Sequence, residues 1–286
     1  MEQPMDGNFV EQLVRFGQDD KLVGILSRPA SGDVGKTALL ALNAGALHRA
    51  GPCRMSVLMA RRYAAAGIPV LRFDFYGIGD SDAVGRAKTG EGNSASRVDV
   101  HEALDYLETN LGIERVVVHG LCSGARDAIK AALADPRIVG VSQIDGYAYR
   151  NSGYMLQKMK VFLISPAKWV NFIRVRMPGA AEESVAETAD IQTPEWDDYP
   201  SREEVAGWYS ALAERGVRFL VVFTGSWSKE YNYEGQFHDN FPAASLPAQT
   251  TLKYMPWANH VLGSAPDREN FLEALGVFLA ECSSAG

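Results

Sequence analysis

A short glycine-flanked segment, Gly120–Gly124 (GLCSG), holds the residue best suited to covalent chemistry, Cys122. The apolar run VVVH before it predicts a strand, and ARDAIKAAL after it predicts a helix that begins at once. A strand, a tight turn and a helix in that order form a nucleophile elbow, whose strained turn exposes the nucleophile. The helix N-terminus would favour a thiolate. We therefore predict that Cys122 is a nucleophile, a buried inert cysteine being the alternative. Ser123 is expected to offer its backbone N–H to an oxyanion.

The elements that must position this cysteine alternate between strand and helix. An opening hairpin is predicted from Val10–Phe16 and Lys21–Pro29. Apolar runs then predict six buried strands, separated mostly by amphipathic helices, at Thr37–Asn43, Val70–Phe73, Glu114–His119, Arg137–Ile144, Phe219–Phe223 and Thr251–Met255. This alternation is typical of an α/β fold with a mostly parallel sheet.

One long interruption, residues 146–216, separates two of these strands. It contains a Met- and aromatic-rich stretch, an acidic linker from Glu182 to Asp198 and a helix predicted at Ser201–Glu214. A crossover in a parallel sheet needs far fewer residues. We predict a helical lid insertion at 146–216, with residues 1–145 and 217–286 forming the core; additional core packing is the alternative.

Two further segments accompany the elbow. Asp74–Ser81 (DFYGIGDS) resembles the D-x-x-G-x-G-x-S segment of α/β-hydrolases, and Asn43–Ala46 (NAGA) stands where that superfamily has its first oxyanion loop. With the elbow, the whole chain resembles an α/β-hydrolase of the cysteine-nucleophile (GxCxG) subgroup. The resemblance implies an α/β-hydrolase fold: an eight-stranded, mostly parallel sheet with helices on both faces. It also implies that the backbone N–H groups of Ala46 and Ser123 form the oxyanion hole.

A narrower resemblance rests on two stretches of sequence. His48-Arg49-x-Gly51-Pro52 and RFDFYGIGDS are similar to those of hydrolases that accompany exosortase systems. Similar cysteine-elbow hydrolases occur in bacterial biosynthetic gene clusters. This resemblance implies a substrate that is a biosynthetic intermediate.

The base and the acid follow from the order nucleophile, acid, histidine in the superfamily. His260 lies just past the last predicted strand and is the expected base. The usual aspartate is missing after the strand that ends at Phe223. Asp145, at the end of an earlier strand, is the favoured acid, because a strand end would orient an imidazole well. Glu230 is its rival; Glu234, Asp239 or a Cys–His dyad without an acid remain open.

Candidate substrate-binding residues surround these positions. His48 and Arg49 follow the oxyanion loop, and an arginine there could bind a carboxylate or phosphate; an ion pair on a solvated loop is the alternative. Tyr147 and Tyr231 flank the two acid-bearing segments. They are expected either to contact substrate or to pack beneath the lid.

Composition excludes several classes of protein. The net charge is −7 and no basic run occurs, so neither nucleic acid nor an anionic membrane is an expected partner. The three cysteines do not suggest a disulfide framework, and no zinc-ligand spacing is present. We predict a cytoplasmic protein without metal or cofactor, and the sequence leaves its oligomeric state open.

Thiolate chemistry leads to three hypotheses about function. Attack on an acyl carbon gives an acyl-cysteine, and water would then complete the hydrolysis of an ester or thioester. Transfer to another acceptor would instead make the chain an acyltransferase or condensing enzyme. The third hypothesis is a non-catalytic ligand-binding protein. For both enzymes the expected substrate is a small-molecule or carrier-linked acyl compound.

Overall fold

The computed structural model describes residues 8–31, 34–82, 92–164, 199–241 and 250–284. Eight strands form one sheet across these residues, as expected. The strands are β1 (Phe9–Phe16), β2 (Leu22–Pro29), β3 (Thr37–Ala41), β4 (Val70–Asp74), β5 (Arg115–Leu121), β6 (Ile138–Ile144), β7 (Arg218–Thr224) and β8 (Thr250–Met255).

The order of the strands places β5 at the centre of the sheet. The order is β1-β2-β4-β3-β5-β6-β7-β8. β2 is antiparallel to both β1 and β4, whereas every other neighbouring pair is parallel. The carboxyl ends of β3 to β8 therefore meet at one edge, where α/β sheets generally bind ligands.

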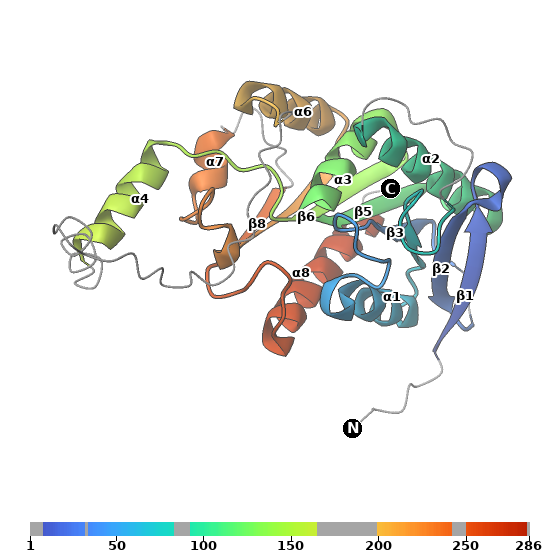
Figure 1. The fold of residues 1–286 in the computed structure, drawn as a ribbon. Coiled ribbons are helices and arrows are strands. Elements are labelled where there is room, and N and C mark those ends of the chain that lie inside the picture. The colour runs from blue at the N-terminus through green and yellow to red at the C-terminus, as the bar shows by residue number, and fades with distance from the viewer. Residues whose placement is uncertain (1–7, 32–33, 83–91, 165–198, 242–249, 285–286) are drawn as a thin grey trace, which may run out of the picture.

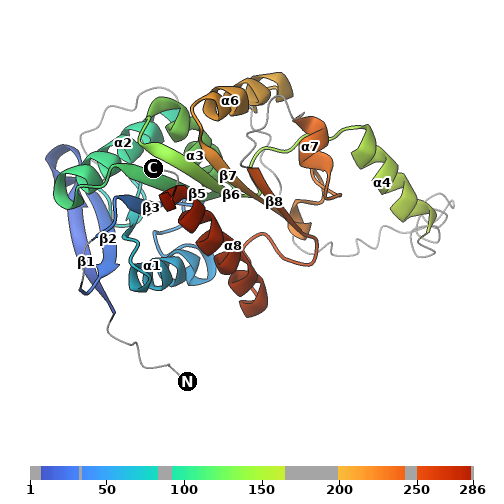
Figure 2. The same ribbon diagram turned by 180° about the vertical axis from the view of Figure 1, so that it is seen from behind.

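Helices cover both faces of this sheet, as predicted (Figures 1 and 2). They are α1 (Met55–Ala65), α2 (Gly92–Leu111), α3 (Ser123–Ala134), α4 (Ser152–Leu163), α6 (Arg202–Glu214), α7 (Gln236–Asn240) and α8 (Ala265–Ser284). α1 and α8 pack on one face around Met59, Leu220 and Phe271. α2, α3, α6 and α7 pack on the other face, where Leu104 and Tyr209 are buried.

Two helices of the predicted insertion lie within the described residues. α6 begins after Ser201, whose hydroxyl accepts a hydrogen bond from the Glu204 backbone (3.1 Å), so the S-x-x-E pattern acts as an N-terminal cap. α4 extends away from the sheet in Figure 1. Of its side chains Tyr154 is buried, whereas Met155 and Met159 are exposed. Residues 165–198, which include the predicted acidic linker, lie outside the described part, and the lid remains a prediction.

The helices are also too polar or too short to span a lipid bilayer. This holds for each helix in the described ranges.

Candidate active site

Cys122 occupies the sharp turn between β5 and α3. Its backbone has φ 57° and ψ −114°, a left-handed conformation that is strained for a residue with a side chain. A Cβ atom at Gly120 would come within 2.1 Å of the Gly124 oxygen, and one at Gly124 within 2.3 Å of the Asn43 oxygen. The two glycines are therefore required for the turn to close.

Two other side chains join Cys122 at this edge of the sheet. His260 lies in the loop after β8, and its Nδ1 is 2.7 Å from Oδ2 of Asp145, which directly follows β6. The other side of the imidazole interacts with Cys122 and lowers the pKa of its thiol. Asp145 is fully buried and also accepts hydrogen bonds from the backbone N–H and the hydroxyl of Thr224, both at 2.7 Å. Thiol, imidazole and carboxylate thus form one continuous chain.

The charges around Cys122 and His260 favour a thiolate–imidazolium pair. Burial opposes ionisation of Cys122, but the hydrogen bond and charge of His260, with the charge of Arg126, lower the pKa of the thiol. Burial likewise opposes protonation of His260, but Asp145 and Cys122 together raise its pKa to about 9. By contrast, burial raises the pKa of Cys282 to about 12. Cys122 is therefore the more readily ionised of these two thiols.

The rival acids lie elsewhere. Glu230 is ion-paired with Arg150 (2.7 Å), and the hydroxyl of Tyr233 donates a hydrogen bond to Asp239 (2.5 Å). The Tyr231 hydroxyl donates a hydrogen bond to the backbone oxygen of Glu234. Among the described carboxylates, Asp145 is the one that contacts His260.

The predicted oxyanion loop is fastened to the elbow. The Ser123 hydroxyl accepts a hydrogen bond from the Gly45 backbone N–H (2.7 Å), which gives this side chain a structural partner beside Cys122. Asn43 donates to Asp74 (3.2 Å) and accepts from the Phe75 backbone (2.8 Å). These bonds hold Ala46, which follows Gly45, in a loop next to the start of α3.

His48 and Arg49 face two carboxylates. The Arg49 guanidinium contacts Asp74 and lies 2.7 Å from Asp80, and His48 Nε2 is 3.5 Å from Asp80. His48, Asp74 and Asp80 lie close enough together to share a cation. Arg49, however, already contacts both carboxylates and supplies the positive charge there. Its guanidinium is thus engaged with protein groups.

The two tyrosines expected near the substrate are buried. Tyr147 is 1% exposed and packs edge-on against Tyr199 and Trp208. Tyr231 is fully buried, and its ring stacks on Phe223 with centroids 3.8 Å apart. In this conformation both rings are core contacts, and neither is free to touch a bound substrate.

Three residues of the site were not identified from the sequence. Thr224 holds Asp145, Arg126 lowers the pKa of Cys122, and Trp227 stacks on His260. Arg126 follows Cys122 by one helical turn, and this i, i+4 spacing could have indicated it. The other two depend on contacts between loops, for which the sequence carries no local signal.

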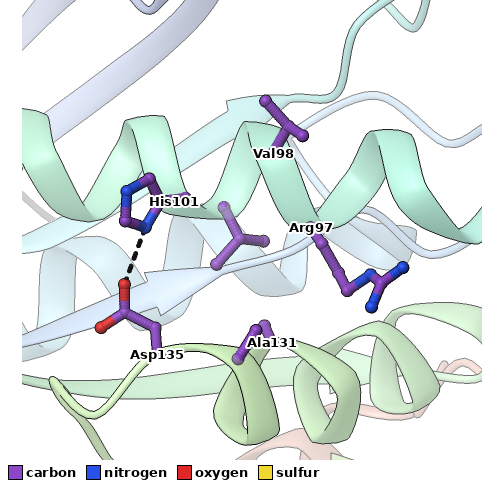
Figure 3. A pocket seen from close by; sticks show the side chains of 7 residues that line it. Arg97, Val98, His101, Ala131 and Asp135 are labelled. Atoms are coloured by element: carbon purple, nitrogen blue, oxygen red, sulfur yellow. Dashed lines mark hydrogen bonds and ion pairs between the residues drawn. The ribbon is translucent and has the colours of Figure 1, made fainter. Parts of the chain in front are cut away.

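A separate cavity of about 350 Å³ lies between α2 and α3 (Figure 3). It is lined by Arg97, Val98, His101, Ala131 and Asp135, among others. No residue of the Cys122–His260–Asp145 chain lines it, so it is distinct from the candidate active site.

Comparison with solved structures identifies the architecture. An esterase from Pyrococcus furiosus superposes over 98% of this chain and 94% of its own, with a TM-score of 0.61 and 16% identity. A proline iminopeptidase from Mycobacterium smegmatis matches over 96% and 99%, with a TM-score of 0.59 and 16% identity. The chain has the α/β-hydrolase fold.

A third α/β-hydrolase fold neighbour is brefeldin A esterase, a bacterial homologue of human hormone-sensitive lipase. It covers 99% of this chain and 80% of its own, with a TM-score of 0.58 and 19% identity. No protein-family model matches the sequence, and neither does any curated protein. At these low identities the likeness concerns the fold.

Proposed function

We propose that the chain is a cysteine hydrolase that cleaves acyl esters or thioesters. The observation that carries this proposal is the continuous contact from Asp145 through His260 to Cys122, with 2.7 Å between Asp145 Oδ2 and His260 Nδ1. The esterases among the structural neighbours support the choice of substrate class.

The first half of the reaction forms an acyl-cysteine. The Cys122 thiolate attacks the acyl carbon, and the oxygen that becomes negative is bound by the backbone N–H groups of Ser123 and Ala46. The His260 imidazolium then donates its proton to the leaving alkoxide or thiolate. Asp145 orients the imidazole and stabilises its charge throughout.

Water completes the reaction. Neutral His260 removes a proton from a water molecule, whose oxygen attacks the acyl-cysteine. Collapse of the adduct releases the acid and returns the Cys122 thiolate beside a protonated His260. Amides are poorer substrates, because a thiolate leaves the tetrahedral adduct more easily than an amine does.

The test compares wild type with Cys122→Ala on p-nitrophenyl esters and acyl-thioesters. We expect kcat/KM to fall by about 10³-fold or more, because nucleophile and base act as a unit. Mass spectrometry of the quenched wild type should show the acyl group on the peptide containing Cys122. Cys53→Ser, which removes an exposed thiol, is the control and should keep full activity. Retained turnover in Cys122→Ala would refute the proposal.

A further inference from the structure

Trp227 covers one face of the candidate base. Its indole stacks on the His260 imidazole with ring centroids 5.3 Å apart and planes 10° from parallel. The Trp227 side chain is only 8% exposed. Its Nε1 is buried and has no hydrogen-bond partner among the described residues. An unpaired buried N–H is unfavourable for folding, so stability alone does not explain why an indole stands here.

The backbone fixes this stacking in place. Trp227 ends a short 3-10 turn, Gly225–Trp227, that directly follows β7. The Gly225 backbone donates a hydrogen bond to Ala258 in the His260 loop (3.1 Å). A Cβ atom at Gly225 would lie 2.0 Å from the Pro256 oxygen, so the two loops are in close contact. The indole is therefore carried by a turn that is bonded to the loop of the histidine it covers.

We propose that Trp227 is a positioning residue for the Cys122–His260 pair: its ring holds the imidazole in the plane that joins Asp145 to Cys122 and stabilises the imidazolium through its π face. An aromatic face attracts a cation, and tryptophan does so most strongly of the aromatic residues. Stacking also restricts rotation of the imidazole, which would otherwise break its hydrogen bond with Asp145 and move it away from Cys122. This inference rests on the proposed function.

The charged groups around His260 determine the direction of the expected effect. Asp145 faces it from the end of β6 and Cys122 from the elbow, while Arg126 of α3 acts on Cys122. None of the three lies in the Gly225–Trp227 turn that carries the indole. Loss of the π face should lower the pKa of His260 and, through the weaker imidazolium, raise the pKa of Cys122. The pH range in which the ion pair exists then narrows from both sides.

The experiment uses a Cys53→Ser background, which removes one exposed thiol. The alkylation rate of Cys122 by iodoacetamide against pH gives the lower pH limit of the ion pair, and the NMR titration of His260 gives the upper limit. The wild-type ion pair should persist up to about pH 9, the pKa of His260. In Trp227→Leu the upper limit should fall by about one pH unit, the size of a cation–π contribution. Trp227→Phe keeps a weaker π face, so its upper limit should lie between those of the wild type and Trp227→Leu.

Trp257 provides the matched control. It lies in the same loop as His260 but is 67% exposed. Trp257→Leu should therefore leave the lower and the upper pH limit of the ion pair unchanged. If Trp227→Phe and Trp227→Leu shift the limits equally, or neither shifts them more than Trp257→Leu, the proposal is wrong. Trp227→Phe removes part of a buried ring, so packing alone should cost some thermal stability, and the pH limits rather than stability test the proposal.

The alkylation readout separates this proposal from the proposed function. A wild-type Cys122 with an ordinary thiol profile, or no turnover of any acyl substrate, would contradict the hydrolase. The order of the pH limits in Trp227→Phe and Trp227→Leu tests the role of Trp227 without requiring a substrate.

Discussion

Asp145 connects three strands of the sheet through its carboxylate. It follows β6, accepts two hydrogen bonds from Thr224 at the end of β7, and contacts His260 beyond β8. Its φ of 50° is unusual for a residue other than glycine. Asp145 is thus held in one orientation by Thr224, which takes no part in the proposed reaction, and this suits it to fix the imidazole.

Asp145→Asn is expected to reduce kcat by about 10²–10⁴-fold, because an amide can stabilise the wrong imidazole tautomer and cannot balance the imidazolium charge. Steady-state kinetics with a p-nitrophenyl ester provide the measurement. Circular dichroism should show an intact fold.

Glu230→Gln is the matched control for this prediction. Glu230 pairs with Arg150 and is partly exposed, so its loss should leave kcat within about twofold. If Glu230→Gln were inactive and Asp145→Asn were active, Glu230 would be the acid.

At the scale of secondary-structure elements, the elbow depends on how closely α3 approaches the loop after β3. Gly124→Ala would place a methyl group 2.3 Å from the Asn43 backbone oxygen. We expect the free energy of unfolding to fall by about 1–3 kcal/mol, as overpacked sites generally do. Activity should fall more steeply, because the displaced loop carries Ala46, the proposed oxyanion donor. Urea unfolding and kcat measurements would test both effects.

Gly207 offers a glycine with free space for comparison. It lies within α6, and a Cβ atom there would meet nothing within 4 Å. Gly207→Ala should stabilise the protein by about 0.5–1 kcal/mol through helix propensity and leave activity unchanged. If the two alanine variants unfolded alike, the close contact at Gly124 would not matter for the fold.

For the whole molecule, the sequence was sufficient to predict the eight strands and most helices. Buried parallel strands such as Phe219–Phe223 are continuous apolar runs, and the structure extends this one to Arg218–Thr224. The five-residue α7 was not predicted as a helix, and α4 was predicted only as part of a helical insertion, without bounds of its own. Short helices of this kind depend on tertiary contacts, such as the packing of Phe237 against Tyr209.

The site was only partly predictable. Cys122 and His260 could be placed because the elbow and the end of the last strand have recognisable local patterns. The choice between Asp145 and Glu230 depended on which carboxylate reaches the imidazole. Burial of Tyr231 and ion pairing of Arg49 likewise depend on which residues meet in space. Periodicity along a sequence cannot supply these distances.

The resistance of the whole molecule to acid should depend on Asp135, beside the cavity in Figure 3. Burial would raise the pKa of this carboxyl, but hydrogen bonds from Arg137 and His101 lower it from 3.8 to about 2. A lowered folded pKa stabilises the protein above the unfolded value. Asp135→Asn should therefore reduce the free energy of unfolding by about 1–3 kcal/mol at pH 7. The difference should shrink below pH 4 and be mostly lost as the pH falls through about 2, the folded pKa.

Asp105→Asn is the control, because Asp105 also pairs with Arg137 (2.8 Å) but its side chain is 53% exposed. Its effect should stay below about 1 kcal/mol. Equal losses from the two variants, or a difference that is undiminished at pH 2, would contradict the assignment. Urea unfolding across this pH range is the measurement.

The hydrogen bond between Ser123 Oγ and the Gly45 N–H has a thermal consequence. Because it fastens the oxyanion loop to the elbow before any substrate arrives, the loop loses its conformational entropy when the protein folds. Binding then requires little further ordering of these donors. Heating should therefore accelerate catalysis along a straight Eyring line until the protein itself unfolds.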